Sequence, residues 1–249
     1  MRLEVLAQGA GPGIVLLPSL GRGAADFDPI AQQLAASGFR VLRPQPRGIG
    51  ASHGPPYADL HDCAADIAAA IESDGGGPAL VAGHAFGNRV ARMLATDRPD
   101  LVRGVGLIAA NVGHAPSTPE IRAAIRDSAN PDLPEPERLK ALQFAFFAPG
   151  NDPRPWLDGW YPDVLAAQRI AGDRTARQED YAGGGAPILY LQPSHDPLAH
   201  AEDAREFKRA LGDRVTVVVI DNASHAAVAE QPAAISRALI DFARRLWPV

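Results

Sequence analysis

The chain has 249 residues, of which 46% are hydrophobic and 21% charged, and 24 basic against 29 acidic residues give a net charge of −5. This composition predicts a folded globular protein, with one large domain or two small ones, and lacks the features of a disordered chain. The acidic balance disfavours nucleic acid and anionic membranes as partners. The single cysteine excludes an internal disulfide, and the sequence shows neither a signal-peptide pattern nor an apolar run of membrane-spanning length, so we expect a cytoplasmic protein.

Short apolar runs bounded by glycine and proline alternate with longer segments of helical period. The runs predict strands at residues 13–18, 39–44, 78–84, 102–110, 187–193 and 214–221. Amphipathic segments predict helices at residues 26–37, 59–73, 201–211 and 233–246. This alternation is typical of parallel strands joined by crossover helices, and nearly continuous apolar strands indicate burial on both faces. The sequence therefore predicts an α/β fold with a mostly parallel central sheet covered by helices on both faces.

The alternation stops between residues 112 and 185. This stretch has many prolines, two of the three tryptophans and no convincing strand. We expect it to form a helical cap inserted into a core domain that consists of residues 1–111 and 186–249. Its aromatic side chains either pack inside the cap or line a pocket beneath it. The candidates for that lining are Phe144, Phe147, Trp156 and Trp160.

Residues 81–92, VAGHAFGNRVAR, predict a strand that turns sharply into a helix. Gly83 and Gly87 flank residue 85 at the spacing of a nucleophile elbow, a strained turn that exposes its central side chain at a helix N-terminus. Serine usually occupies that central position, but this chain has Ala85. Because a methyl group cannot form an acyl-enzyme, the most reactive group of such a site is missing.

With two downstream motifs, this turn resembles the α/β-hydrolase family, and the resemblance extends from about Gly13 to the last helix. The motif PILYLQPSHDPLAH places Asp196 just past a strand, where the family has its triad acid. The motif IDNASHAAVAEQP places His225 after the last strand, where the family has its base. The resemblance implies an oxyanion hole formed by the backbone N–H groups of Leu20 and Phe86.

Asp196 and His225 are residue types that form an acid–base pair. The imidazole accepts a proton from the attacking group, and the carboxylate fixes its tautomer and stabilises the imidazolium. Asp180, Asp203 or an acid after the fourth strand remain alternatives for the carboxylate. Ser19 and Ser224 lie near these motifs, but neither is in an elbow.

The alanine is either an engineered replacement or a natural divergence. An engineered change would leave the rest of the family pattern intact. Here the usual His-Gly before the oxyanion residue is Pro18-Ser19, Asn88 follows Gly87 where glycine is frequent, and Gln45 replaces a usual aspartate. These three departures favour natural divergence.

Three functions are open. The first is a hydrolase of a small carboxylic ester, lactone or thioester by ancestry, with acyl-enzyme chemistry absent or severely impaired. The second is an enzyme that uses the Asp196–His225 pair as a general base without a covalent step, such as a C–C hydrolase, lyase or isomerase. The third is a ligand-binding pseudoenzyme. Chemistry with an aspartate nucleophile is disfavoured because residue 85 carries no carboxylate.

We expect a small, uncharged or mildly polar ligand, and His84 in the elbow is a further candidate for contact with it. No cofactor is implied. No metal site is expected either, because His84, His114, His195 and His200 lack the spacing that a zinc site favours. The sequence does not indicate an oligomeric state.

Overall fold

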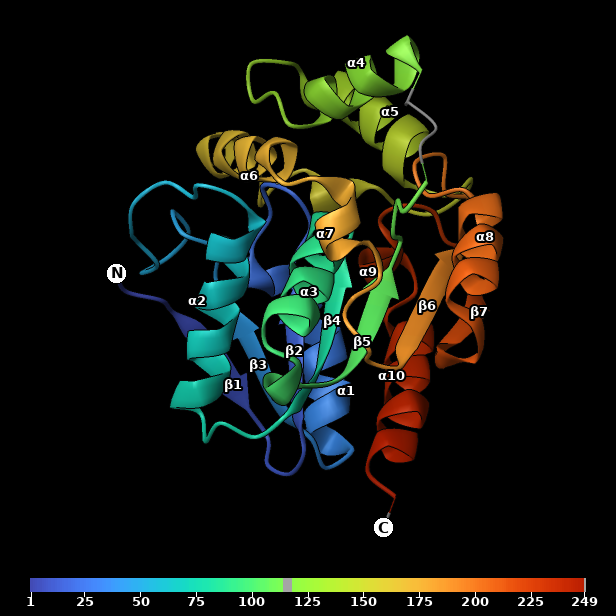
Figure 1. The fold of residues 1–249 in the computed structure, drawn as a ribbon. Helices are drawn as coiled ribbons and strands as arrows, with labels where there is room; N and C mark the ends of the chain where they lie inside the picture. The colour runs from blue at the N-terminus through green and yellow to red at the C-terminus, as the bar shows by residue number, and fades with distance from the viewer. Residues whose placement is uncertain (114–117, 249) are drawn as a thin grey trace.

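A seven-stranded sheet forms the centre of the protein in the computed structural model, which describes residues 1–113 and 118–248. The strands are β1 (Val5–Gln8), β2 (Gly13–Leu17), β3 (Arg40–Pro44), β4 (Ala79–His84), β5 (Val102–Ile108), β6 (Ile188–Pro193) and β7 (Val215–Ile220). They lie in the order β1-β3-β2-β4-β5-β6-β7, and only β1 runs antiparallel to its neighbour. The carboxyl ends of the parallel strands therefore meet at one edge of the sheet, below α4 and α5 in Figure 1.

Helices cover both faces of the sheet. The helices of the core are α1 (Asp28–Ala36), α2 (Leu60–Ser73), α3 (Phe86–Asp97), α8 (Ala201–Leu211), α9 (Ala227–Glu230) and α10 (Pro232–Leu246). Along β2, Ile14 and Leu16 pack in the cluster that contains α1 and α10, whereas Val15 and Leu17 pack in the cluster that contains α2, α3 and α8. Alternate side chains of a strand point to opposite faces, so the continuous apolar run of β2 packs against the helices on both faces of the sheet.

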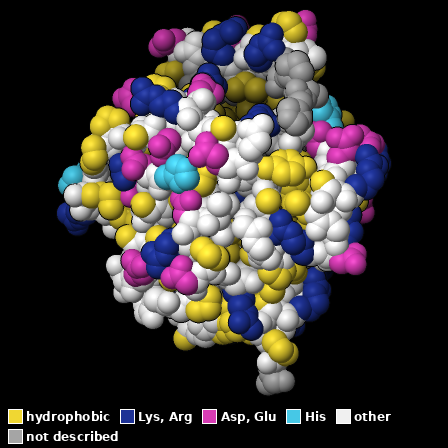
Figure 2. All heavy atoms as spheres, in the orientation of Figure 1, with side chains coloured by type: hydrophobic (Ala, Val, Ile, Leu, Met, Phe, Trp, Pro, Cys, Tyr) yellow, Lys and Arg dark blue, Asp and Glu magenta, His cyan; other side chains and the backbone are white. Residues whose placement is uncertain are grey.

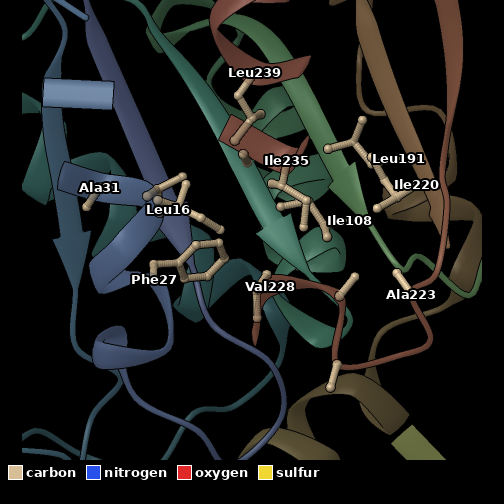
Figure 3. Packing of buried hydrophobic residues seen from close by; sticks show 14 of the residues in the cluster. Leu16, Phe27, Ala31, Ile108, Leu191, Ile220, Ala223, Val228, Ile235 and Leu239 are labelled. Atoms are coloured by element: carbon tan, nitrogen blue, oxygen red, sulfur yellow. The ribbon is translucent and has the colours of Figure 1, made fainter. Parts of the chain in front are cut away.

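The core beneath α10 is close-packed (Figure 3). Ile235 and Leu239 on α10 pack with Leu16, Ile108 and Leu191 of the sheet, and all five side chains are at most 1% exposed. Burial of such side chains contributes about 1.5–3 kcal/mol each. This packing holds in place the carboxyl ends of β4, β6 and β7, from which the loops of the candidate site extend.

The predicted α/β architecture with a mostly parallel sheet is confirmed, and each predicted strand and helix has a counterpart in the structure. The strand β1 was not predicted. It has four residues, three of them only partly buried, and pairs on a single side with β3. A short edge strand of this kind has no long apolar run to identify it.

Between β5 and β6 the described residues form helices and add no strand to the sheet. These helices are α4 (Pro119–Ser128), α5 (Glu135–Phe146), α6 (Pro162–Arg174) and α7 (Arg177–Tyr181). Figure 1 shows α4 and α5 above the carboxyl edge of the sheet, with α7 beside α3. The division into a core of residues 1–111 and 186–249 and a cap of residues 112–185 stays a prediction about domain boundaries.

Candidate active site

The turn between β4 and α3 holds Ala85 in a backbone conformation that residues with a Cβ atom seldom adopt. Its φ is 47° and its ψ is −110°. A conformation of this kind costs on the order of 1–3 kcal/mol. The N–H of Ala85 donates to the carbonyl oxygen of Ile108 at 2.9 Å, which anchors the turn to β5. The chain therefore has the strained backbone of an elbow, with a methyl group as its side chain.

Two glycines make this turn sterically possible. A Cβ atom on Gly83 would lie 2.1 Å from the carbonyl carbon of Gly87. A Cβ atom on Gly87 would lie 2.5 Å from the carbonyl oxygen of Leu17. Both distances are far inside van der Waals contact, and the opposing atoms belong to the backbone of packed elements. The first turn of α3 can approach β2 and β4 this closely only without side chains at these two positions.

His225 and Asp196 form a buried pair at the same edge of the sheet. The Nδ1 atom of His225 lies 2.9 Å from Oδ2 and 3.2 Å from Oδ1 of Asp196. The Asp196 side chain is 0% exposed, and its Oδ1 also accepts hydrogen bonds from the N–H groups of Leu198 and Ala199. With Nδ1–H donated to the carboxylate, Nε2 of a neutral His225 is left as a proton acceptor.

Hydrogen bonds tie the two loops of this pair to each other. The N–H group of Ser194 donates to the carbonyl oxygen of Ile220, and the N–H group of His195 donates to that of Ala223. The Ser224 hydroxyl donates to the His195 carbonyl oxygen at 3.1 Å. The loop after β6 and the loop after β7 are thus joined on both sides of the pair. Such a network restricts the imidazole to one orientation.

The carboxylate of Glu230 is hydrogen-bonded to the loop that carries His225. One carboxylate oxygen accepts from the Ser224 N–H at 2.6 Å, and the other accepts from the Ala148 N–H and the Asn151 amide at 2.7 Å. Burial raises the pKa of this carboxyl group, while the three hydrogen bonds oppose that shift. No sequence pattern indicates a function for Glu230, because a glutamate at the end of a short helix is usually solvated.

His84 lies under the pair. Its Nε2 lies 2.7 Å from the carbonyl oxygen of His225, and since a carbonyl only accepts, Nε2 carries the proton. Its Nδ1 is buried without a hydrogen-bond partner in the part of the chain that the structure describes. Burial first, and the nearby His225 second, lower the pKa of His84 to about 3. His84 is therefore a neutral buried donor that holds the backbone of His225.

A cavity of about 270 Å³ lies over Ala85 and His225. Leu20 and Phe86 line it, which places the two predicted oxyanion donors around the same space as the elbow and the imidazole. Phe86 is the first residue of α3, so its N–H has no partner four residues earlier in the helix. A carbonyl group above Ala85 would therefore lie close to the His225 imidazole and to the N–H group at the start of α3, which is unpartnered within the helix.

Of the aromatic residues predicted to line the pocket, only Trp160 does so. Phe144 is 58% exposed, whereas Phe147 and Trp156 are buried and pack edge to face, with ring centroids 5.8 Å apart. His84 is fully buried below the cavity. The lining predicted for these four side chains needs correction, because their helix and loop positions direct them to solvent or to the core.

Several lining residues were not predicted. Phe146 lines the cavity in place of its neighbours Phe144 and Phe147. Three arginines, Arg89, Arg169 and Arg177, also line it, which is unexpected for a pocket thought to take an uncharged ligand. Arginines on helices are ordinarily solvated, so nothing in their sequence context distinguishes them.

The alternative acids and serines have other surroundings. Asp180 forms ion pairs with Arg89 at 2.9 Å and Arg92 at 3.0 Å. Asp203 lies beside Gly113. Ser19 lines the cavity but belongs to the loop after β2 and not to the elbow, as its sequence position predicts.

Of the other predicted histidines, His195 and His200 are not in the cavity lining, and the described residues contain no group of metal ligands. His195 Nδ1 lies 2.8 Å from the Ser194 hydroxyl, His200 precedes α8, and His114 lies outside the described residues. Within residues 1–113 and 118–248, no three His, Cys, Asp or Glu side chains group as metal ligands would. Over the same residues, no helix combines the length and apolarity needed to cross a membrane.

Comparisons with known proteins agree with this architecture. The 2-(acetamidomethylene)succinate hydrolase of Mesorhizobium japonicum is 26% identical over 262 residues, which cover 96% of this chain and 91% of that protein. The sn-1-specific diacylglycerol lipase ABHD11 of Mus musculus is 26% identical over 258 residues, which cover 93% of this chain and 80% of that protein.

Among solved structures, BpoC of Mycobacterium tuberculosis H37Rv is similar in fold, with a TM-score of 0.83 at 22% identity and coverage of 99% of this chain and 97% of that chain. The model of the alpha/beta hydrolase family matches residues 14–238, which include strands β3 to β7, the elbow, Asp196 and His225. The chain therefore belongs to the alpha/beta hydrolase family.

Proposed function

We propose that the protein derives from a hydrolase of small carboxylic esters, lactones or thioesters, and that Ala85 leaves its acyl-enzyme chemistry absent or severely impaired. The observation that carries this proposal is the positive φ of Ala85 in a cavity shared with His225. An alanine gains nothing from such strain, whereas a nucleophile in that turn is held against the base. The names of the two relatives, a hydrolase and a lipase, support the hydrolytic ancestry.

The geometry supports the usual sequence of acyl transfer up to the missing hydroxyl. A serine at position 85 would pass its proton to Nε2 of His225, while Asp196 stabilises the imidazolium. The N–H groups of Phe86 and Leu20 would bind the developing oxyanion. Loss of the nucleophile from a triad costs up to about 10⁶ in turnover, with about 10³ to 10⁴ over water remaining from binding and the oxyanion hole.

General-base chemistry without a covalent step is the second candidate. Nε2 of His225 has no protein hydrogen-bond partner among the described residues, and the imidazole lines the cavity. A water molecule placed there would give its proton to Nε2 as its oxygen bonds to the substrate carbonyl carbon, and the imidazolium would return that proton to the leaving oxygen. A pseudoenzyme that only binds a ligand would not need this pair.

The deciding experiment restores the hydroxyl. We expect Ala85→Ser to raise kcat for para-nitrophenyl butyrate by about 10² or more, because the base and the backbone donors stay in place. His225→Ala in the Ala85→Ser background should abolish the gain. Ala109→Ser is the matched control, since Ala109 also has a positive φ, 50°, and lines the same cavity without standing at the start of a helix; it should give no gain.

The activity of the parent protein, with Ala85 in place, distinguishes the two candidate functions. If slow hydrolysis by the parent is lost in His225→Ala and kept in Ser19→Ala, His225 works as a general base without a serine. A parent with no activity on esters and no gain in Ala85→Ser would reject ester hydrolysis by either route and leave general-base chemistry on another class of substrate or a ligand-binding role.

A further inference from the structure

The cavity above Ala85 has an arginine wall. Arg89 comes from α3, Arg169 from α6 and Arg177 from α7, and no acidic side chain lines the cavity among the residues that the structure describes. Acidic residues outnumber basic ones over residues 112–185, so the composition of this region does not explain the wall. We refer to Arg89, Arg169 and Arg177 as the arginine wall.

The members of the arginine wall differ in how they are held. Arg89 is fixed by Asp180 and by a hydrogen bond of 2.9 Å from Nη1 to the Gly172 carbonyl oxygen. Arg177 donates from Nη1 to the Gly113 carbonyl oxygen at 2.7 Å, and it forms no ion pair with any residue that the structure describes. Arg169 is exposed, and no ion pair of Arg169 occurs in the described part of the chain.

Neighbouring acids do not neutralise the wall. The carboxylate of Asp180 is shared between Arg89 and Arg92, which is 3% exposed, so these three residues carry an excess positive charge. Asp203 lies beside Gly113 and supplies one further carboxylate. Even with Asp203 counted, the guanidinium groups around the cavity outnumber the carboxylates.

A second recess, also lined by arginines, adjoins the cavity. It has a volume of about 530 Å³ and shares Trp160, Leu165 and Arg169 with the cavity. It adds Arg122 and Arg126 of α4, and Arg126 pairs with Asp127 at 3.3 Å. Figure 2 shows dark blue Lys and Arg side chains, with magenta Asp and Glu side chains among them, over the upper part of the molecule, where Figure 1 places α4 and α6. An anion that approaches the cavity from this side meets guanidinium groups along its path.

The remaining lining is apolar. Ile125, Phe146, Trp160 and Leu165 face the cavity together with the arginine wall. A ligand that matches both surfaces has a short hydrocarbon part and an anionic end. The reacting carbonyl group then lies between them, over Ala85 and His225.

We propose that the substrate class of this site is a small ester or related acyl compound that carries a separate free carboxylate, bound by Arg177 and Arg169. This inference rests on the proposed function, whose acyl chemistry it makes specific. A guanidinium presents a planar fork of N–H donors that matches the two oxygens of a carboxylate. The expectation of an uncharged ligand is replaced by that of a monoanion.

Binding to the parent protein tests the charge preference without catalysis. By calorimetry, we expect monomethyl succinate to bind at least about tenfold more tightly than methyl butyrate, its neutral counterpart, and added salt to weaken that binding. Arg177→Gln and Arg169→Gln should each lower the affinity for monomethyl succinate about tenfold, and Arg177→Lys should lower it less. Arg174→Gln is the matched control, because Arg174 is exposed at the end of α6 and does not line the cavity.

Three results would overturn the inference. These are equal affinity for the two esters, equal losses in Arg177→Gln and in the Arg174→Gln control, and tighter binding of methyl phosphate than of monomethyl succinate. The third would show that the wall recognises phosphate and not carboxylate.

A kinetic comparison distinguishes failure of the carboxylate inference from failure of the proposed hydrolase function. In Ala85→Ser, kcat/KM for mono-para-nitrophenyl succinate should exceed that for para-nitrophenyl butyrate by about tenfold, and Arg177→Gln should remove the difference. A gain on both esters with no preference would reject the carboxylate inference alone. Binding that depends on Arg177 without any gain in hydrolysis would reject the hydrolase proposal alone.

Discussion

The loops at the edge of the sheet and the helices above them differ in how firmly they are held. Asp196 and His225 are less than 10% exposed and lie in loops that are hydrogen-bonded to each other. Arg169 and Arg177 are exposed on α6 and α7. Under the proposed function, we expect the hydrogen-bonded loops to determine which reaction is possible and the helices above them to determine which ligand is bound.

The largest effect on stability is expected where the two regions meet. Asp180 of α7 joins Arg89 and Arg92 of α3, and Asp180 and Arg92 are at most 3% exposed. Asp180→Asn would leave two guanidinium groups without their anion, so we expect the free energy of unfolding in urea to fall by about 3–5 kcal/mol. Asp173→Asn, on the exposed surface of α6, is the control and should change it by less than about 0.5 kcal/mol. Similar losses in both variants would show that α7 is not braced through this carboxylate.

A smaller but still clear loss is expected inside the elbow. Gly83→Ala would place a Cβ atom 2.1 Å from backbone atoms of Gly87, so α3 must move away from β4. We expect the melting and urea midpoints to fall by the equivalent of about 1–3 kcal/mol. Gly185→Ala, where a Cβ atom would meet nothing within 4 Å, should be neutral within about 0.5 kcal/mol. A neutral Gly83→Ala would mean that the turn tolerates a wider spacing than the structure shows.

The smallest effect concerns a surface contact between the regions, and it depends on pH. His61 of α2 bonds to Asp97 at 2.7 Å and to Glu179 of α7 at 3.2 Å, and these hydrogen bonds raise its pKa above the usual 6.5. A raised folded pKa means that the stabilisation is complete below pH 6.5 and is lost as the pH rises through the folded value. Because the side chain is 44% exposed, solvent limits the gain to a few tenths of a kcal/mol, about 0.2–1.

The measurement compares the unfolding free energy of the parent with that of His61→Asn at about pH 5.5 and about pH 9. The difference should be present at the lower pH and absent at the higher one. His53→Asn is the control, because His53 Nδ1 contacts only the Ala51 carbonyl oxygen. A difference that is larger at high pH would contradict the assignment.

The sheet and the elbow could be predicted from sequence because their signals are local. Gly83 and Gly87 stand at a fixed spacing around Ala85, and the close backbone contacts explain why no other residue fits. Asp196 and His225 follow strands whose carboxyl ends meet at one edge, so the strand order brings them within hydrogen-bonding distance. What these residues do chemically stays a prediction.

The lining of the cavity could not be predicted in the same way. Successive residues of a helix point about 100° apart, so Phe144 at the exposed surface and Phe146 at the cavity differ by only two positions on α5. Arg169 and Arg177 reach the cavity from separate helices whose relative placement depends on long-range packing. Neither aromatic content nor charge pattern carries that information.

The elbow also has a consequence for how easily the protein could change in evolution. Every alanine codon becomes a serine codon by a change of its first base, and the glycines, the backbone donors and the His225–Asp196 pair already surround residue 85 in the arrangement that a serine would use. We infer that a single point mutation separates this chain from the triad of the proposed function. Under the proposed function, the costly backbone geometry of the elbow is already in place, and the missing hydroxyl group lies one mutational step away.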